Sequence, residues 1–194
     1  LRMDARTDVL DPATATIIRT PVDEAGMLDR LYETYYFNAV DPIAARWKEH
    51  LMNAVDQAMR DHRIEAVVIS IPPFSTGDLG VAIARNHGLP LIVDLRDAWS
   101  LWLITPYVSY LHYRWRLRRE RRVLTAADAV SVTSAQTIAD LKALHPMIPG
   151  ERFHLITNAF DQPVPDIPSV IHVRKATPDA PLRIGYVGSF YYTP

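Results

Sequence analysis

The sequence predicts an α/β domain built on a doubly wound, mostly parallel sheet. Short apolar runs of strand length alternate along the chain with segments of helical periodicity. The runs are continuous rather than alternating, as in strands that are buried on both faces. With 194 residues, the chain is long enough to enclose one sizeable core.

The first predicted elements lie in residues 14–69. Residues 14–20 are rich in β-branched side chains and predict a short strand. Asp41 and Pro42 predict the start of a helix, with Asp41 as the cap and Pro42 at the first helical position. That helix has one apolar face and runs to about His62. Residues 66–69 then predict a buried strand.

The alternation continues to residue 157. Residues 71–77 predict a loop, because two prolines do not fit a sheet interior, and the helix after it ends at Gly88. The remaining predicted elements are strands at 91–95, 129–133 and 153–157, a loop at 96–99, a helix over about 108–124, and a helix capped by Ser134 that carries Ile138 and Leu141.

Composition and motifs exclude several classes of function. The net charge is −1, there is no cysteine, and no apolar run approaches the roughly 18 residues of a membrane span. We therefore expect a cytoplasmic protein without a thiolate metal site. Residues 77–80 (GDLG) do not form a dinucleotide fingerprint, and there is no phosphate-binding P-loop, nucleophile elbow or zinc-binding histidine spacing. We expect no metal and no cofactor.

A domain boundary is predicted near residue 178. Residues 162–181 contain five prolines and no periodicity, which is typical of an interdomain linker. A strand signal resumes at 182–188. We therefore expect a first domain at 1–178 and the first strand and loop of a second domain at 179–194. Since the chain starts without Met and stops just after that strand, we expect a fragment truncated at both ends; the alternative is a complete small domain with a ragged tail.

The candidate site lies at the carboxyl ends of the predicted strands, where open parallel sheets bind ligands. These ends comprise residues 72–77, 96–99, 134, 158–161 and 188–192. Each segment alone is compatible with a structural role. Ser75, Thr76 and Ser134 could cap helices, Asn158 and Asp161 could form a turn, and Asp97 could pair with Arg96. Their shared location favours a binding site.

The order of five motifs resembles the family-four, GT-B type glycosyltransferases of the glycosyl transferase group 1 superfamily. The motifs are IPPFS (71–75), DLRDAW (94–99), ADAVSVTS (127–134), ITNAFD (156–161) and YVGSFY (186–191). The resemblance implies two Rossmann-like domains that face each other across a cleft, the first for the acceptor and the second for a nucleotide-sugar donor. It also implies retention of anomeric configuration without a metal, and a saccharide or lipid-linked acceptor in cell-envelope or exopolysaccharide synthesis.

The resemblance assigns roles to individual residues. Arg96 and Asp97 point into the cleft as the catalytic pair. The implied substrate-binding residues are Ser75, Thr76, Trp99, Ser134, Asn158 and Asp161, and the implied donor-binding residues are Gly188, Ser189 and Phe190. The chain departs from the family in having Ala159 after Asn158 where glycine is usual. The family's first strand, with its glycine-rich loop, should precede residue 14 and is missing, so we expect a fold incomplete at its N-terminus and a fragment inactive alone.

Residues 114–122 form a basic segment with six arginines and one glutamate. Just upstream lie Tyr107, Tyr110 and Tyr113, and Trp115 lies within the segment. Arginines and aromatics on one helix favour contact with anionic lipid, which predicts peripheral attachment to the inner face of the membrane through residues 107–122. The alternative is a helix that covers the sheet, with Trp115 in the core and the arginines in solvent. The net charge and the motifs argue against nucleic acid.

Two further functions remain open from the sequence. A sugar-nucleotide epimerase can share the GT-B fold, but it needs no acceptor. A non-enzymatic Rossmann-like module would bind a ligand without turnover, and residues 182–192 would then dock as an edge strand.

Overall fold

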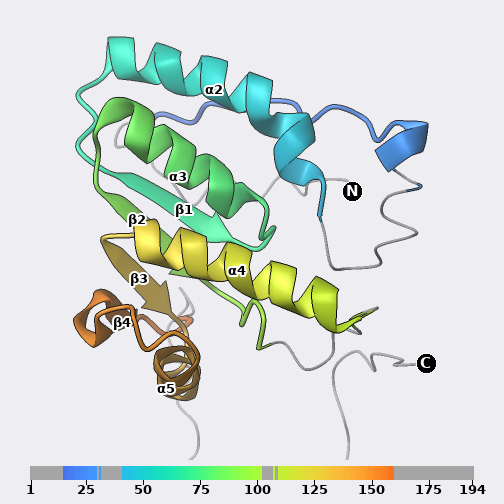
Figure 1. Cartoon of the computed structure of the whole chain (residues 1–194). Helices are drawn as coiled ribbons and strands as arrows, with labels where there is room; N and C mark the ends of the chain where they lie inside the picture. Colours follow the sequence, from blue (N-terminus) through green and yellow to red (C-terminus); the bar gives the residue numbers. More distant parts are fainter. Residues whose placement is uncertain (1–14, 30, 32–40, 102–106, 108, 160–194) are drawn as a thin grey trace, which may run out of the picture. The chain divides into compact units, whose positions relative to one another are not determined.

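The computed structural model describes residues 15–29, 31, 41–101, 107 and 109–159 (Figure 1). The chain divides into two units, residues 1–157 and 158–194, and each is described by itself. Of the second unit only Asn158 and Ala159 are described. The predicted linker at 162–181 and the predicted strand at 182–188 lie outside the described residues.

The first unit contains a four-stranded sheet in which all neighbouring strands are parallel. The strands are β1 (Val67–Ile71), β2 (Leu91–Leu95), β3 (Ala129–Val132) and β4 (Phe153–Leu155), in spatial order β1-β2-β3-β4. Their register pairs Ile69 with Val93 and Val93 with Val130. The prediction of an α/β domain with a parallel sheet is confirmed, and the strands begin or end within two residues of their predicted bounds.

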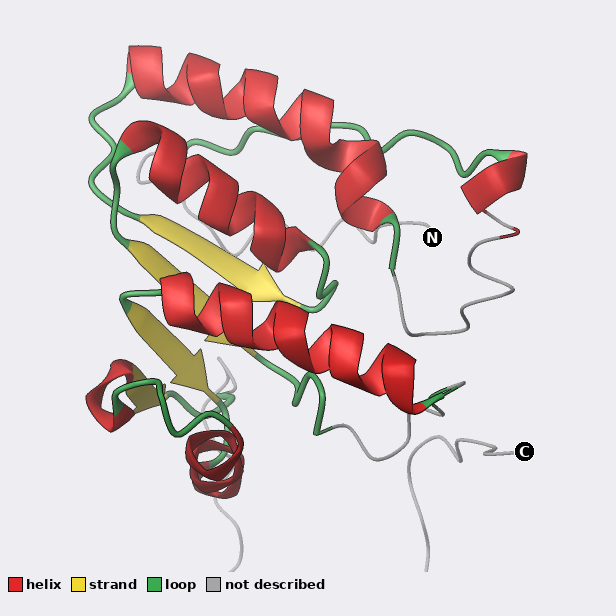
Figure 2. Cartoon of the chain, viewed as in Figure 1, coloured by secondary structure: helices red, strands yellow, loops and turns green. Residues whose placement is uncertain are grey.

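Three helices connect the strands on one face of the sheet: α3 (Thr76–His87), α4 (Tyr110–Ala126) and α5 (Ala135–Leu144). A fourth, α2 (Ile43–Asp61), precedes β1 and packs against α3, and a 3₁₀ turn, η1 (Gly150–Arg152), precedes β4. Right-handed crossovers between strands in this order place α3, α4 and α5 on the same face. Figure 2 shows α3 and α4 side by side over the strands, with α2 beyond α3. The described elements include no helix on the opposite face, where a doubly wound sheet carries its second layer.

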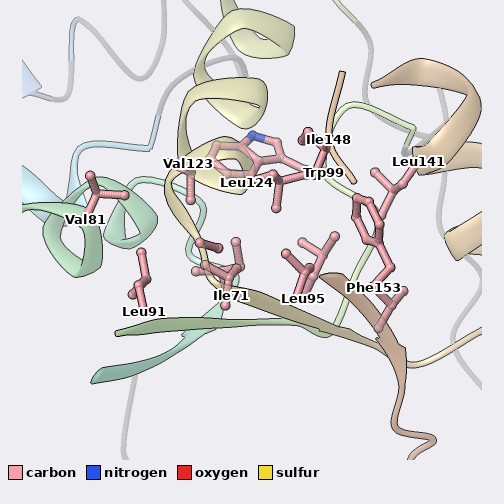
Figure 3. Close-up of a cluster of buried hydrophobic side chains, with 14 of the residues drawn as sticks. Ile71, Val81, Leu91, Leu95, Trp99, Val123, Leu124, Leu141, Ile148 and Phe153 are labelled. Carbon is pink, nitrogen blue, oxygen red and sulfur yellow. The ribbon is translucent and has the colours of Figure 1, made fainter. Parts of the chain in front are cut away.

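The core fills the space between the sheet and these helices (Figure 3). In β2, Leu91, Val93 and Leu95 are buried toward the helices, whereas Ile92 and Asp94 alternate with them on the other face. Burying an aliphatic side chain of this size contributes about 1.5–3 kcal/mol. Core side chains come from every described strand and from α3, α4 and α5.

Two glycines of α3 allow close packing. A Cβ added at Gly80 would lie 2.7 Å from Cγ2 of Ile69 in β1, and one at Gly77 would lie 3.1 Å from Cγ1 of Val123 in α4. Residues 77–80 therefore serve helix packing. Gly88 ends α3 with φ of 65° and donates its N–H to Ala84, which confirms the predicted helix stop.

The face of the sheet opposite the helices carries a polar row. Ser70, Asp94 and Ser131 lie opposite one another on β1, β2 and β3. The Asp94 carboxylate accepts hydrogen bonds from Ser70 Oγ at 2.8 Å and from Ser131 Oγ at 2.6 Å. Both oxygens of Asp94 are therefore used within the sheet.

The strand predicted at 14–20 is wrong, since residues 15–20 form no strand. The segment runs along α2 instead, where Trp47 Nε1 donates to Thr20 Oγ1 at 2.7 Å. Ile17 and Ile18 are about half exposed, at 46% and 50%. The segment has the β-branched composition of a strand, but it pairs with no neighbouring strand. Its tertiary contacts with α2 fix its conformation instead.

The predicted cap of α2 is also wrong. Pro42 occupies the cap position, and no side chain of its own segment caps the helix. The Asp41 carboxylate is directed to Ser75 instead, where Oδ2 accepts the Ser75 N–H at 2.8 Å. A partner 34 residues away thus outcompetes the local helix N–H groups.

Candidate active site at the carboxyl edge of the sheet

The carboxyl ends of the four strands meet at one edge. Ile71 pairs with Leu95, Leu95 with Val132, and Val132 with Leu155. The segments that follow these strands, residues 72–77, 96–99, 133–134 and 156–157, are called the rim here. The strand register confirms the predicted shared edge for residues 72–77, 96–99 and 134. Residues 158–161 belong to the second unit, and residues 188–192 lie outside the described residues.

Hydrogen bonds join the rim segments to one another. Arg96 N–H donates to Ile71 O at 3.0 Å, Thr133 Oγ1 donates to Arg96 O at 3.3 Å, and Ile156 N–H donates to Val132 O at 3.0 Å. The backbone of Arg96 is therefore fixed between the ends of β1 and β3. The residue that follows it, Asp97, is held in place by the same backbone.

The side chains of Arg96 and Asp97 are exposed on this fixed backbone. Arg96 has an interaction partner of its own. Two consecutive residues at the centre of the rim therefore expose a guanidinium and a carboxylate. A carboxylate accepts hydrogen bonds from hydroxyls, and a guanidinium donates to phosphates or hydroxyls.

An aromatic stack lies beneath the rim. The rings of Phe74 and Trp99 are stacked, with centroids 5.1 Å apart and planes at 14°. Trp99 is 1% exposed and belongs to the core. The stack joins the loop after β1 to the loop after β2, so the structure places Trp99 as a support for both loops.

The structure also buries Ser75 and Thr76. Ser75 is 1% exposed; its Oγ donates to the Asp41 carboxylate and accepts the Ala44 N–H at 3.0 Å. Ser75 therefore performs for α2 the capping function predicted for Asp41. Thr76, 3% exposed, donates its hydroxyl to Pro73 O at 2.6 Å. Both hydroxyls are engaged within the protein and hold the loop after β1.

A buried carboxylate of α4 also holds the loop after β2. Glu120 of α4 is fully buried, and its Oε2 accepts the Ser100 N–H at 2.9 Å. His145 Nε2 lies 3.4 Å from Oε1 of the same carboxylate, within ion-pair distance although not aligned as a hydrogen bond. Sequence reasoning missed this contact. The only sequence feature that could have indicated it is that Glu120 is the single acidic residue among the arginines of 114–122.

Arg116 of α4 is the second buried charge below the rim. Its guanidinium lies over the Phe74 ring at 4.8 Å and over the Tyr107 ring at 5.7 Å. Burial lowers the pKa of Arg116, and the charges of Tyr107, Glu120 and Asp41 act in the opposite direction. Arg116 thus packs against the aromatic stack and contributes to the support of both loops.

Tyr107 approaches the same loop. Its hydroxyl donates to Ser100 O at 3.2 Å, so Ser100 is held through its N–H by Glu120 and through its carbonyl by Tyr107. Burial raises the pKa of Tyr107, and the charge of Arg116 opposes this shift.

The remaining predicted site residues fall into two groups. Ser134 is half-buried at the cap position of α5, but its side chain makes no capping hydrogen bond. Asn158 is exposed and opens the second unit. Asp161, Gly188, Ser189 and Phe190 lie outside the described residues.

A cavity of about 790 Å³ opens beside Ser75, between the starts of α2 and α3 and the outer face of α4. Trp115 and the arginines of α4 line it, so the indole is 42% exposed and not in the core. Arg119 and Arg122 both pair with Asp78 at the start of α3. The cavity therefore offers an indole, two arginines that pair with Asp78, and Arg118, which forms no ion pair within the described part of the chain. This combination suits a polar ligand.

The described residues contain neither a cluster of metal ligands nor a membrane-spanning helix. No three histidine, aspartate or glutamate side chains there come close enough together to bind a metal ion. Among the helices of the same residues, none combines the length and the apolar composition of a bilayer crossing.

Comparison with known proteins identifies the family. The model of the glycosyl transferase 4-like domain matches residues 2–159, which include every described strand and the whole rim. No curated protein matches the chain. With its parallel Rossmann-like sheet and this match over most of its length, the chain belongs to the glycosyl transferase 4-like domain family, and it is a glycosyltransferase domain of the GT-B type.

Proposed function

We propose that this domain binds the acceptor in the transfer of a sugar from a nucleotide-sugar to a saccharide or lipid-linked acceptor. The reaction proceeds with retention and without a metal, and it serves cell-envelope or exopolysaccharide synthesis. The observation that carries the proposal is the exposed Arg96–Asp97 pair at the centre of a rim that buried groups hold from below. Family membership supplies the reaction class.

Asp97 accepts a hydrogen bond from the acceptor hydroxyl that is to be glycosylated, and Arg96 donates to a neighbouring hydroxyl or phosphate oxygen. Ser134 contributes a hydroxyl that its helix does not use. Ser75, Thr76 and Trp99 act from beneath by fixing the loops that carry these groups. Because the backbone that carries these groups is held in place, less conformational entropy is lost when they orient a substrate.

The donor binds beyond the first unit. Asn158 and Asp161 turn the chain toward a donor domain that residues 179–194 begin, after a linker at 162–181. Gly188, Ser189 and Phe190 form its first loop, in which backbone N–H groups meet donor phosphate oxygens. The composition of these residues and the unit boundary after Thr157 support the proposal.

The protein acts in the cytoplasm and rests on the inner face of the membrane through the first half of α4. Tyr110 and Leu111 are 69% and 75% exposed there, and Trp115 is 42% exposed. Arg114 is exposed beside them. Aromatic, aliphatic and cationic groups on one exposed helix face favour an anionic bilayer surface. Replacing Leu111 and Trp115 with serine should reduce co-sedimentation with anionic vesicles several-fold; equal sedimentation would remove this part of the proposal.

The test of the reaction class is a donor panel. Protein carrying this domain is incubated with UDP- and GDP-linked sugars, with and without saccharide or lipid-phosphate acceptors, and products are separated by mass spectrometry. A new glycoside that forms only with acceptor is the expected result. Conversion of the donor sugar without acceptor would instead indicate an epimerase, and binding of ligand without any turnover would indicate a non-enzymatic module.

A further inference from the structure

A second groove lies toward the end of the helical layer opposite the rim, and it shares Arg118 and Arg122 with the cavity beside Ser75. It has a volume of about 490 Å³ and is lined by Arg85 at the end of α3, by Arg118, Arg121 and Arg122 of α4, and by Met147. Thr125 and Ala126 complete its wall. Since α3 and α4 both end near the starts of the next strands, the groove is at the amino edge of the sheet, away from Arg96 and Asp97.

Three of the four arginines in this groove have no acidic partner within the described part of the chain. Among the described residues that line it there is no carboxylate. Arg122 shares Asp78 with Arg119, but Arg85, Arg118 and Arg121 take part in no ion pair within the described part of the chain. Arg118 stands three and four positions from Arg121 and Arg122, a spacing at which like charges on a helix destabilise it by about 0.2–0.5 kcal/mol per pair.

Arginines of this arrangement match one ligand chemistry. A guanidinium donates two parallel hydrogen bonds to a carboxylate or to a phosphate. Several guanidinium groups around one groove favour a phosphate or diphosphate, because it carries more charge and more acceptor oxygens than a carboxylate. The carbonyls at the end of α4 would repel an anion, but Arg152 donates to Thr125 O at 3.1 Å and to Ala127 O at 3.0 Å. These two carbonyls at the end of α4 therefore already have a cationic hydrogen-bond donor.

A small apolar slot adjoins the groove. It has a volume of about 120 Å³, lies between α3 and α4, and shares Arg85 and Ala126 with the groove. Val81, Ala84 and Leu91 also line it. The combined shape accepts a phosphate group with a small apolar group attached to it.

We infer that the groove formed by Arg85, Arg118, Arg121 and Arg122 is a binding site for a phosphate-bearing ligand, separate from the rim. It recognises a phosphate or diphosphate group, which can come from a soluble phosphate compound or from a lipid headgroup. This inference does not depend on the proposed function, because it rests on a different surface.

The test compares the wild-type chain with two double variants of equal net charge. Arg118→Gln with Arg121→Gln removes two unpaired arginines from the groove. Arg60→Gln with Arg63→Gln removes two exposed arginines of the same chain outside it. Inorganic pyrophosphate is titrated by calorimetry at 0.15 M salt, and sedimentation with phosphatidylcholine vesicles containing 20% phosphatidic acid is measured in parallel.

We expect the groove variant to lose at least tenfold in affinity in one or both arms, with the control variant unchanged. Loss in the pyrophosphate arm identifies a soluble phosphate ligand, and loss in the vesicle arm alone identifies a lipid headgroup. Wild-type binding should also raise the unfolding temperature, since a ligand that binds the native state stabilises it. No binding in either arm, or equal loss in both variants, would overturn the inference. Matching far-ultraviolet circular dichroism of the two variants verifies that both are folded.

Discussion

Replacing Glu120 with alanine should destabilise the domain strongly. Glu120 is fully buried, and its carboxylate accepts the N–H of Ser100, itself only 5% exposed. The change leaves that N–H without a partner and removes the group beside His145. It also removes a negative charge that compensates the buried guanidinium of Arg116. An orphaned buried donor costs about 1–3 kcal/mol, and removal of one partner from a buried charge pair costs about 3–5 kcal/mol.

We therefore expect a loss of about 3–5 kcal/mol in the free energy of unfolding for Glu120→Ala. Glu120→Gln keeps an oxygen for the Ser100 N–H and loses only the charge, so its loss should be smaller. Because a domain of this kind is stable by only about 5–15 kcal/mol, the alanine variant should unfold at a much lower urea concentration.

The assay is urea unfolding followed by tryptophan fluorescence, with Glu65→Ala as the control. Glu65 pairs with Arg63 at 2.8 Å, but their side chains are 73% and 89% exposed, and such a pair contributes less than about 1 kcal/mol. A midpoint for Glu120→Ala as close to wild type as that of Glu65→Ala would refute the reasoning that this buried carboxylate anchors the loop after β2.

Three further substitutions test the packing and the caps by the same unfolding assay. Gly80→Ala should cost about 1–3 kcal/mol, because its Cβ would lie 2.7 Å from Ile69 Cγ2; an unchanged midpoint would mean that α3 and β1 are not in close contact. Gly88→Ala should cost about 1 kcal/mol through its φ of 65° alone, since nothing lies within 4 Å of its Cβ, and a larger loss would contradict this. Ser75→Ala should cost about 1–2 kcal/mol by removing the acceptor of the Ala44 N–H, and stability equal to wild type would exclude Ser75 as the cap of α2.

The sheet could be predicted from the sequence because its signals are local. Each strand is a short apolar run between helical segments, and Gly88 ends its helix through its own backbone. Parallel register then follows from the alternation, and with it the gathering of the strand ends at one rim. These inferences needed no knowledge of which side chains meet.

The incorrect predictions depended on distant partners. Asp41 has the sequence of a helix cap, but Ser75 competes for its carboxylate across 34 residues. Residues 15–20 have strand composition but lie along α2. Propensity cannot register either contact, because it describes a residue only within its own segment.

Only part of the candidate site could be predicted, because sequence patterns do not show contacts between distant segments. The positions of Arg96 and Asp97 follow from the end of β2. The support beneath them does not, because Glu120, Arg116 and Tyr107 reach Ser100 and Phe74 only in the folded domain. The sequence also could not separate the exposed arginines of α4 from the buried Arg116.

The most direct test of the account concerns Asp97, the exposed carboxylate at the centre of the rim. Once a donor and acceptor are identified, kcat/KM for sugar transfer is measured for Asp97→Ala and, as control, for Asp140→Ala, an exposed aspartate on α5. The account predicts a loss of at least about tenfold for Asp97→Ala with an unchanged unfolding midpoint, corresponding to about 1.4 kcal/mol of transition-state stabilisation, and no loss for the control. Wild-type kcat/KM in Asp97→Ala would contradict the claim that this rim binds the acceptor.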